Sequence, residues 1–326
     1  MISKLSTKDM SRMDWLMQRT KGIGGSDMAA ILGMNSYRGP YGVWMEKTGR
    51  TELKESDNEA MRVGRDLEEY VASRFCEATG KKVRRVNAII SNTDYPHIQI
   101  NIDREVVGED SILECKTANA YSSDKFRDGI PSAYYVQCVT YMGVYECSRC
   151  YLAVLIMGIG FKWFMLTTHK DDTLPEGCEK LIYVDDTEFE AIRYQANEFW
   201  KYVENDEEPP VDATPGTTDA IKERYPSSVS GKEIDATAIR TNLKARAVLK
   251  AKIDELKGEL DTQENIIKNW LKDAEKASCD GWSVSYKTST RTTLDSKRAK
   301  AEHPEIAWDE YNKVSETRTL RITERN

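Results

Sequence analysis

The sequence predicts an α/β (α+β) fold in which helices flank a mixed β-sheet, followed by a separate C-terminal extension. Three observations predict it. Several segments repeat apolar residues at helical spacing, and shorter runs between them are rich in β-branched and aromatic residues. A stretch rich in proline and acidic residues then interrupts this alternation. We therefore expect a core at 1–208, a linker at 209–230 and an extension at 231–326.

The expected helices of the core end at residues that favour helix termini. They are 9–18, 27–33, 59–79, 131–146 and 185–204. Ser26-Asp27 stands where an N-cap would precede 27–33, and Gly80 is suited to end 59–79. Pro131 is expected at the first position of 131–146, where its missing N–H costs nothing.

The expected strands of the core are separated by glycine-containing turns. They are 86–91, 98–107, 111–117, 149–157 and 161–167. Gly108-Glu109-Asp110 predicts a hairpin between 98–107 and 111–117. This hairpin would place Asp103 opposite Glu114 and Cys115.

The extension is expected to begin with a long helix at 234–275. Its apolar residues follow the 4,3,4 spacing of a coiled coil: Leu249, Ile253, Leu256, Leu260, Ile267 and Trp270. The stripe either packs on its own domain or offers a surface for self-association or a partner. A strand pair at 281–288 and 317–323, around a short helix at 304–313, is expected to complete the extension.

Composition excludes several classes of protein. No apolar run approaches the roughly 18 residues needed to span a membrane, and the N-terminal residues lack an apolar signal segment. We expect a cytoplasmic protein, in the host cytoplasm if the chain is phage-encoded. The net charge of −7 argues against a protein that coats nucleic acid without specificity, although a local basic groove can coexist with it.

The cysteines do not predict a metal–thiolate site. There are seven, an odd number, and their spacing is irregular, which indicates reduced thiols in a chain of this length. Cys147 and Cys150 form a CxxC pair, but no second pair stands at a matching distance.

Residues 98–117 contain the strongest candidate site. Glu114 and Lys116 share one face of the second strand because side chains alternate along a strand. With Asp103 opposite them, two carboxylates and an ammonium would meet at one point. Carboxylates suit Mg²⁺, and the backbone carbonyl of Cys115 could complete its ligands. The lysine would position or activate a water, and the metal would stabilise charge on a phosphodiester.

The simpler alternative is a surface hairpin with a cross-strand salt bridge. The run Ser111-Ile112-Leu113 indicates a largely apolar, central strand and argues against it, because charges at the end of a buried strand need a reason. Glu68 on the preceding helix, and Gln137 and Tyr141 one turn apart on the following helix, add polar groups that could point toward the same place.

These residues also occur in ordered motifs, through which the chain resembles the phage lambda exonuclease and YqaJ viral recombinase family of the PD-(D/E)xK nuclease superfamily. The similarity covers about residues 12–205. The motifs are W-x3-R-x3-I-G-G-S-D at Trp15–Asp27, G-x3-E at Gly64–Glu68, Asp103, E-C-K at 114–116 and Q-x3-Y at Gln137–Tyr141. Ile102 stands where many superfamily members have proline.

The resemblance implies a restriction-endonuclease-like core and a role for each matching residue. Asp103 and Glu114 would bind the metal, Lys116 would assist the attacking water, and Gln137 would orient them. Glu68 would reach a second metal ion or its waters. A pocket for the 5′-phosphate of the digested strand would include Arg19 and Ser26, with Asn101 as a further candidate contact. Tyr141 would support the site.

The implied activity is a 5′-to-3′ exonuclease that resects the ends of linear double-stranded DNA with two Mg²⁺ ions, or with Mn²⁺ in their place. The implied partners are a single-strand annealing recombinase and further copies of the chain in a ring around DNA. Two alternatives stay open: an endonuclease or structure-specific nuclease that uses the same site, and a non-cutting scaffold protein that binds DNA ends.

Overall fold

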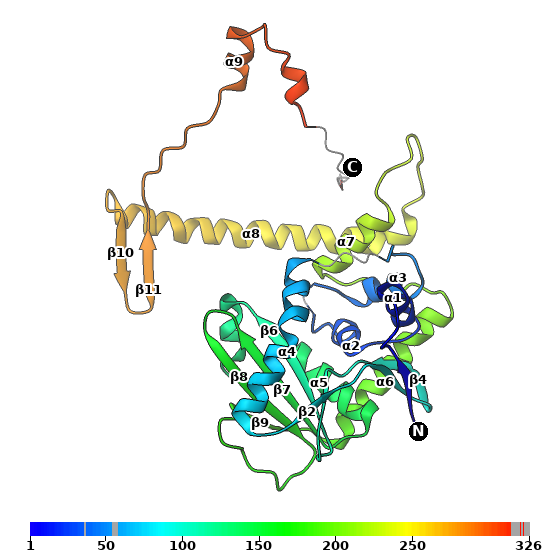
Figure 1. Cartoon of the computed structure of the whole chain (residues 1–326). Helices are drawn as coiled ribbons and strands as arrows, with labels where there is room; N and C mark the ends of the chain where they lie inside the picture. Colours follow the sequence, from blue (N-terminus) through cyan, green and yellow to red (C-terminus); the bar gives the residue numbers. More distant parts are fainter. Residues whose placement is uncertain (36, 54–57, 314–319, 321, 323–326) are drawn as a thin grey trace. The chain divides into compact units, whose positions relative to one another are not determined.

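The structure, a computed structural model, describes residues 1–35, 37–53, 58–313, 320 and 322. The chain divides into two units, Met1–Pro226 and Ser227–Asn326, which are described separately (Figure 1). Within the described part of the chain, no helix combines the length and the apolar character that crossing a membrane requires.

The first unit is built on a mixed sheet with the strand order β2-β5-β6-β7-β8-β9. These strands are Val83–Arg85, Arg104–Val106, Ser111–Ala118, Arg149–Ile156, Gly160–Thr167 and Leu181–Tyr183. β6 pairs with β7 and β8 pairs with β9 in parallel, whereas the other neighbours are antiparallel. The sheet confirms the predicted mixed α/β architecture.

Helices cover both faces of this sheet because the side chains of β6 alternate between two apolar clusters. Leu113 and Cys115 pack with Phe75 of α4, which lies across one face (Figure 1). Ile112 packs in the larger cluster on the other face, together with residues of α2, α3, α5 and α6. Glu114 and Lys116 therefore share the face that carries α5.

The helices of the first unit confirm most of the expected segments. Their bounds are Arg12–Thr20 (α1), Gly25–Ile31 (α2), Pro40–Lys47 (α3), Glu59–Thr79 (α4), Ser132–Tyr145 (α5), Asp186–Glu204 (α6) and Pro215–Arg224 (α7). Gly80 ends α4 in a left-handed conformation, at φ 70°, as expected of a C-terminal glycine. Pro131 is the N-cap of α5 and not its first helical residue.

The predicted N-cap of α2 at Ser26-Asp27 is wrong. Gly24 is the N-cap, and its backbone N–H donates to Oδ2 of Asp27 over 2.9 Å. A carboxylate at the third helical position can reach back to the cap in this way, as in a capping box. The Asp27 side chain is consequently drawn into the interior, where it is fully buried.

The strand expected at 98–107 is two strands in different sheets. β4 (Tyr95–Ile100) belongs to a smaller sheet with β1 (Ile2–Ser6) and β3 (Ala88–Asn92), in the order β1-β3-β4. β5 begins at Arg104 in the main sheet. Periodicity did not show this break, because the buried Ile102 continues the apolar alternation through the crossing point.

The expected linker at 209–230 contains a helix that packs on the first unit. α7 approaches the chain before α3 so closely that a Cβ atom at Gly216 would lie 2.0 Å from the carbonyl oxygen of Tyr37. Thr217 is buried, and Arg224 forms an ion pair with Glu208 over 2.7 Å. Of the prolines that suggested a linker, Pro215 begins α7, whereas Pro209, Pro210 and Pro226 lie outside the helix.

In the second unit, the long helix is shorter than expected, and the strand pair is a different one. α8 spans Arg240–Leu271, and β10 (Lys276–Cys279) pairs with β11 (Trp282–Ser285) in a hairpin. The expected pairing of 281–288 with 317–323 is wrong for the first segment, since β10 is its neighbour, and most of 317–323 lies outside the described residues. α9 (Ser296–Glu302) and a 3₁₀ turn (Trp308–Tyr311) stand near the expected helix at 304–313.

The space around two helical glycines, Gly143 on α5 and Gly64 on α4, predicts opposite effects of their substitution by alanine. A Cβ atom at Gly143 would lie 2.0 Å from Cδ2 of Phe189, whereas one at Gly64 would meet Oγ1 of Thr117 at an ordinary 3.5 Å. We expect Gly143→Ala to destabilise the first unit by about 1–3 kcal/mol through overpacking. Gly64→Ala should instead stabilise it by up to about 1 kcal/mol, since alanine favours helix. Thermal unfolding of both variants measures this, and equal effects would contradict the close contact.

Candidate active site

The site begins where β5 and β6 stop pairing. Their ladder ends with Arg104 opposite Leu113. Asp103, which precedes Arg104 in the chain, continues the contact with β6 through its side chain. Its Oδ2 accepts a hydrogen bond from the backbone N–H of Cys115 over 2.8 Å. The structure therefore places the Asp103 carboxylate beside the strand residues 114–116, as the hairpin predicted.

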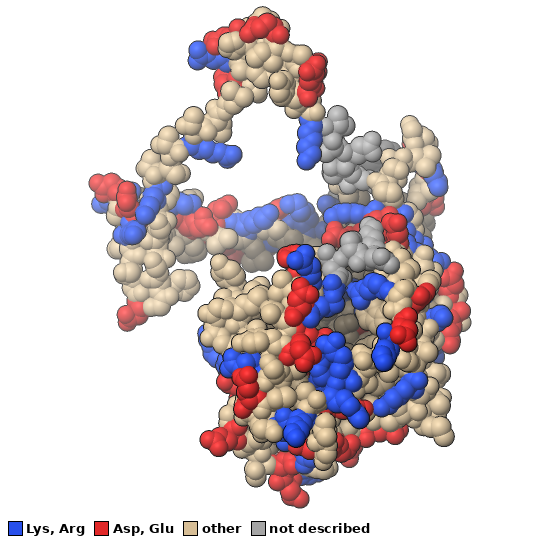
Figure 2. Space-filling model, viewed as in Figure 1, with Lys and Arg blue, Asp and Glu red and all other residues tan. Residues whose placement is uncertain are grey.

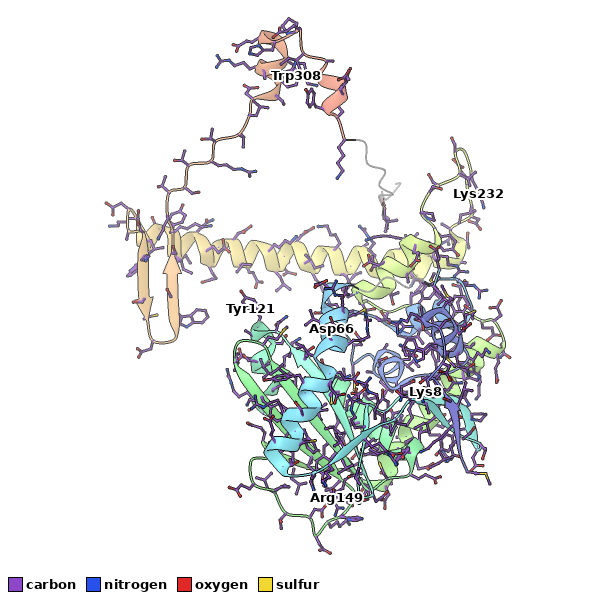
Figure 3. All side chains as sticks on the ribbon, in the orientation of Figure 1. Lys8, Asp66, Tyr121, Arg149, Lys232 and Trp308 are labelled. Atoms are coloured by element: carbon purple, nitrogen blue, oxygen red, sulfur yellow. The ribbon has the colours of Figure 1, made fainter. Side chains whose placement is uncertain are left out.

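Glu114 is the centre of the site. It is 3% exposed, and its Oε1 accepts hydrogen bonds from Nζ of Lys116 (2.6 Å) and Nε2 of Gln137 (2.7 Å). The same Nε2 lies 2.8 Å from the hydroxyl of Tyr141, one turn later on α5. The predicted face of α5 thus points to β6, and these four side chains meet in one place. Figure 3 labels Tyr121 beyond the carboxyl end of β6 and Arg149 at the start of β7, at opposite ends of the sheet.

Buried negative charge dominates the electrostatics. Burial and the nearby Glu114 raise the pKa of Asp103 well above its usual value, and the charge of Glu68 adds to the effect. Burial alone would lower the pKa of Lys116, but the charge of Glu114 outweighs it and raises that pKa. Lys116 is consequently an ammonium that donates hydrogen bonds.

The donor atoms fit a hard divalent cation. Oε2 of Glu114 is buried and has no hydrogen-bond partner among the residues that the structure describes. An unpartnered buried carboxylate oxygen is costly, and a cation beside Asp103 would remove that cost. Mg²⁺ is commonly held by one or two carboxylates, with waters and substrate phosphates completing its shell.

The backbone carbonyl of Cys115 is the third predicted ligand. The N–H and C=O of one strand residue point toward the same edge of the strand. Because the N–H of Cys115 points to Asp103, its carbonyl points to that side as well, where the β5 ladder has already ended. Across the described residues, no group of three or more His, Cys, Asp or Glu side chains forms a metal cluster. The predicted ligand set, two carboxylates and this carbonyl, stays a prediction.

Glu68 is held by arginines at the edge of the site. Its Oε1 accepts from Nη1 of Arg104 over 2.6 Å and from Nη2 of Arg85 over 3.3 Å. Arg104 is 2% exposed, and sequence reasoning did not identify it. Its position directly after Asp103 could have identified it. Adjacent residues of a strand face opposite sides of the sheet, so an Arg104 next to a site-facing Asp103 is expected to face α4 and its Glu68. The role of Glu68 toward a second ion stays a prediction.

The predicted phosphate contacts lie around α1 and the start of α2. The guanidinium of Arg19 stacks over the ring of Trp15 at 4.9 Å, and Nε1 of Trp15 donates to Oδ1 of Asn101 over 3.4 Å. Ser26 is exposed at the second position of α2. The structure thus links Arg19 to Asn101 through Trp15, with Ser26 on the next helix.

A buried ion-pair cluster supports this region, and sequence reasoning missed most of it. Asp27 pairs with Nζ of Lys47 over 2.7 Å and with Nη1 of Arg38 over 2.8 Å, and Arg19 lies 4.0 Å away. Burial would raise the pKa of Asp27, but the charge of Lys47, followed by those of Arg38 and Arg19, lowers it. The sequence around Lys47 does not predict its pairing with Asp27, because the contact forms only when α3 packs beside α2.

Gly25 connects the two parts of the site. A Cβ atom at this position would lie 2.5 Å from Cε1 of Tyr141 and 2.9 Å from Cγ of Gln137. Only glycine allows α2 to approach α5 this closely. Any shift of α2 would therefore reach the hydrogen bonds around Glu114.

Comparisons with known proteins agree with the motifs. The profile of the YqaJ-like viral recombinase domain matches residues 14–148. The uncharacterized protein YqaJ of Bacillus subtilis (strain 168) is 37% identical over 311 residues, which cover 94% of this chain and 91% of that protein.

Solved structures of phage-type exonucleases are similar at low identity. The alkaline exonuclease LHK-Exo of Laribacter hongkongensis matches 60% of this chain and 93% of its own, with 17% identity and a TM-score of 0.46. A phage related exonuclease of Haemophilus somnus 129PT matches 56% of this chain and 94% of its own, with 11% identity and a TM-score of 0.42.

The raised pKa of Asp103 predicts that this residue destabilises the fold. The folded state binds the Asp103 proton more tightly than the unfolded chain does, so the stabilisation is complete at low pH and is lost as pH rises through the folded pKa. At neutral pH without divalent ions, Asp103→Asn should therefore unfold at a higher temperature than wild type. The amide still accepts from the N–H of Cys115.

The gain from Asp103→Asn should shrink as pH falls toward about 3.9, the usual aspartate pKa. Asp66→Asn is the matched control, because Asp66 is 66% exposed on α4 (Figure 3). Thermal unfolding across pH measures both variants. A loss of stability in Asp103→Asn at neutral pH would contradict the buried, unfavourable charge.

Proposed function

Because this chain belongs to the YqaJ-like viral recombinase family, we propose that it is a metal-dependent deoxyribonuclease that resects linear double-stranded DNA from its 5′ ends. The observation that supports this most directly is the buried Glu114 beside the half-buried Asp103, with one Glu114 oxygen unpartnered and Lys116 beside it. A structural salt bridge would not require a second carboxylate whose pKa is raised.

Each residue of the site has a role in phosphodiester hydrolysis. Asp103, Glu114 and the carbonyl of Cys115 would hold Mg²⁺, or Mn²⁺ in its place. When bound, the ion supplies Lewis-acid stabilisation of the charge that develops on the phosphate. Lys116, an ammonium, orients the attacking water or a phosphate oxygen as a donor and does not take its proton.

Residues of α5 and α4 position the groups of the site. On α5, Gln137 donates a hydrogen bond to Glu114 and lies beside the Tyr141 hydroxyl, so that the Glu114 carboxylate is held against this helix. A second ion would require Glu68 to exchange Arg104 for the metal or to reach it through water, since Glu68 now accepts from that guanidinium.

The end-directed part of the proposal rests on the residues around Trp15. An arginine fork grips a phosphate with paired hydrogen bonds, and the Arg19 guanidinium lies over Trp15, which donates a hydrogen bond to Asn101. Lys and Arg side chains gather around a hollow on the face of the first unit that shows α4 (Figure 2). Such local positive charge favours DNA binding despite the net charge of −7.

The partners follow from the same proposal. DNA ends are the substrate, and a single-strand annealing recombinase would take over the 3′ overhang. Assembly into a ring and a cytoplasmic location remain predictions of the family resemblance.

Cleavage of matched DNA substrates tests the activity. Linear double-stranded DNA with or without a 5′-phosphate is incubated beside a closed circle, with Mg²⁺ or with EDTA. We expect Mg²⁺-dependent loss of the linear DNA, fastest with the 5′-phosphate, while the circle stays intact. Lys116→Ala should slow digestion by about 100-fold or more, because it removes a donor aimed at the reacting groups.

Metal binding is measured apart from cleavage as a control. Mg²⁺ at 100 times its dissociation constant should stabilise wild type by about 2.7 kcal/mol and leave Asp103→Asn nearly unchanged. Cutting of the circle would contradict an exonuclease and indicate an endonuclease. Binding of Mg²⁺ or of DNA ends, without cleavage in the presence of any metal, would indicate a non-cutting scaffold protein.

The preference for a 5′-phosphate tests Arg19 separately. Arg19→Ala should lose most of the difference in rate between phosphorylated and unphosphorylated ends, about 10-fold or more, as expected for a charged phosphate contact. Arg12→Ala is the matched control, because Arg12 also stacks on Trp15, at 4.4 Å, without a predicted phosphate role. Equal effects of the two substitutions would assign the loss to Trp15 and exclude a phosphate pocket at Arg19.

A further inference from the structure

The helix α8 presents a long apolar stripe to solvent. The stripe consists of Leu249, Ile253, Leu256, Leu260, Ile267 and Trp270, which are 45–72% exposed. Leu271 is the one buried residue of this helix, all of which the structure describes. Most helices in proteins are stabilised by burying such a face and not by propensity alone. The stripe therefore indicates a surface that is made to be covered.

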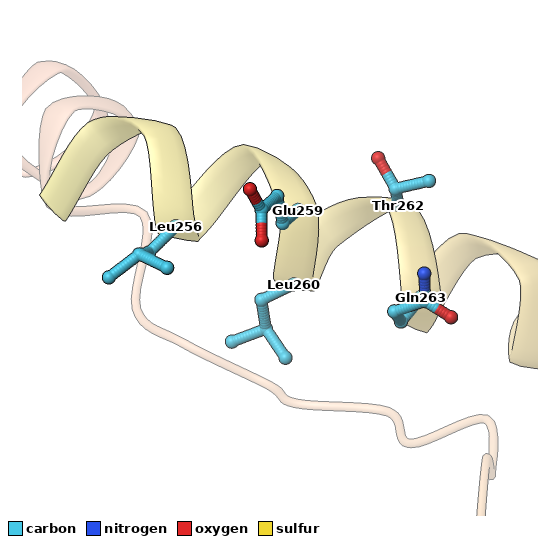
Figure 4. Close-up of a pocket in the computed structure, with 5 residues that line it drawn as sticks. All are labelled: Leu256, Glu259, Leu260, Thr262 and Gln263. Carbon is cyan, nitrogen blue, oxygen red and sulfur yellow. The ribbon is translucent and has the colours of Figure 1, made fainter. Parts of the chain in front are cut away.

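The shape of this surface fits another helix. Figure 4 shows a hollow on α8 lined by Leu256, Glu259, Leu260, Thr262 and Gln263. Leu256, Glu259, Leu260 and Gln263 have the spacing i, i+3, i+4, i+7. Four residues so spaced form the hole that receives one side chain of a facing helix in a coiled coil.

The charges beside the stripe select the orientation of that helix. Its N-terminal half is flanked by Lys250, Lys252 and Lys257, and its C-terminal half by Glu259 and Glu264. A parallel pair of identical helices would set Lys252 against Lys257 and Glu259 against Glu264 of the other copy, and both contacts repel. An antiparallel pair can set Lys250 of each copy against Glu264 of the other, and like charges then meet only at the two-fold axis, where Lys257 and Glu259 each face their own copy.

We propose that α8 binds the α8 helix of a second copy of this chain in an antiparallel coiled coil. Leu256 of each copy enters the hollow of the other beside Leu260. In the same register Leu249 lies opposite Ile267, and Lys250 lies opposite Glu264. Each of these contacts between two different residues occurs twice, as a two-fold interface requires.

This register also uses the ends of the stripe. Arg246 lies opposite Trp270, where a guanidinium can stack on the indole face. A register shifted by one heptad toward the C-terminus would set Leu249 opposite Ala274, beyond the end of α8. In the single chain Lys250 pairs with Asp254 over 2.7 Å and Glu264 with Lys268 over 3.0 Å. Exposed pairs of this kind contribute little and do not prevent the new contacts.

The molar mass of the full chain in solution tests the association. We expect Leu256→Glu to halve the mass measured by light scattering at micromolar concentration, because it places a charge in the hollow of the facing helix. Val248→Glu is the matched control on the outer side of α8, where Val248 is 58% exposed, and it should leave the mass unchanged. Circular dichroism checks that both variants keep their helix content.

An unchanged mass in Leu256→Glu, or a wild-type chain that does not associate, would overturn the proposal and assign the stripe to another occupant. A change of mass in both variants would equally contradict a contact centred on the stripe.

Exchanging charges tests the orientation. Lys250→Glu should weaken the association about tenfold, because it sets two acids against each other at both symmetric contacts. Adding Glu264→Lys to the same chain should restore it. Both changes break pairs within the helix, so recovery in the double variant cannot come from helix stability. If Lys250→Glu left the association unchanged and Glu264→Lys alone strengthened it, the helices would be parallel.

Discussion

The buried carboxylate of Glu114 is the constraint on which the first unit depends. It lies where β6 meets α5, and one of its oxygens is held by Lys116 and Gln137 while the other has no hydrogen-bond partner among the described residues. Burial of an acid beside Asp103 costs stability, and the hydrogen bonds from Lys116 and Gln137 offset part of that cost. The close approach of α2 to α5 at Gly25 keeps Gln137 and Tyr141 in place beside the pair.

The side chains of β6 alternate between the candidate site on one face of the sheet and the apolar core on the other. Glu114 and Lys116 face α5, whereas Leu113 and Cys115 pack against α4. The backbone of Cys115 nevertheless takes part in the site, because its N–H fixes Asp103 at the point where the β5 ladder ends. One strand can therefore supply a carboxylate, an ammonium and a carbonyl while the other face keeps the sheet packed. The early interruption of β5 leaves the edge of β6 beside Asp103 without a strand partner.

Charged side chains are arranged differently in the two units. In the first, cations surround a buried acid, as Lys47 and Arg38 surround Asp27. In the second, charges of opposite sign divide along α8 and flank an exposed apolar stripe. A chain with a net charge of −7 thus contains both a buried ion-pair cluster and a helix with segregated charges.

The sequence by itself determined the elements whose signals are local. The period of 59–79, the left-handed Gly80 and the turn at 108–110 sufficed to place α4 and to set Asp103 beside Glu114. Only the tertiary structure decided the contacts between residues far apart in the chain. The ion pair of Lys47 with Asp27, the partner of Glu68 and the packing of Gly216 against Tyr37 depend on how helices approach one another. Periodicity records which face of an element is buried, but it contains no information on which distant side chain that face will meet.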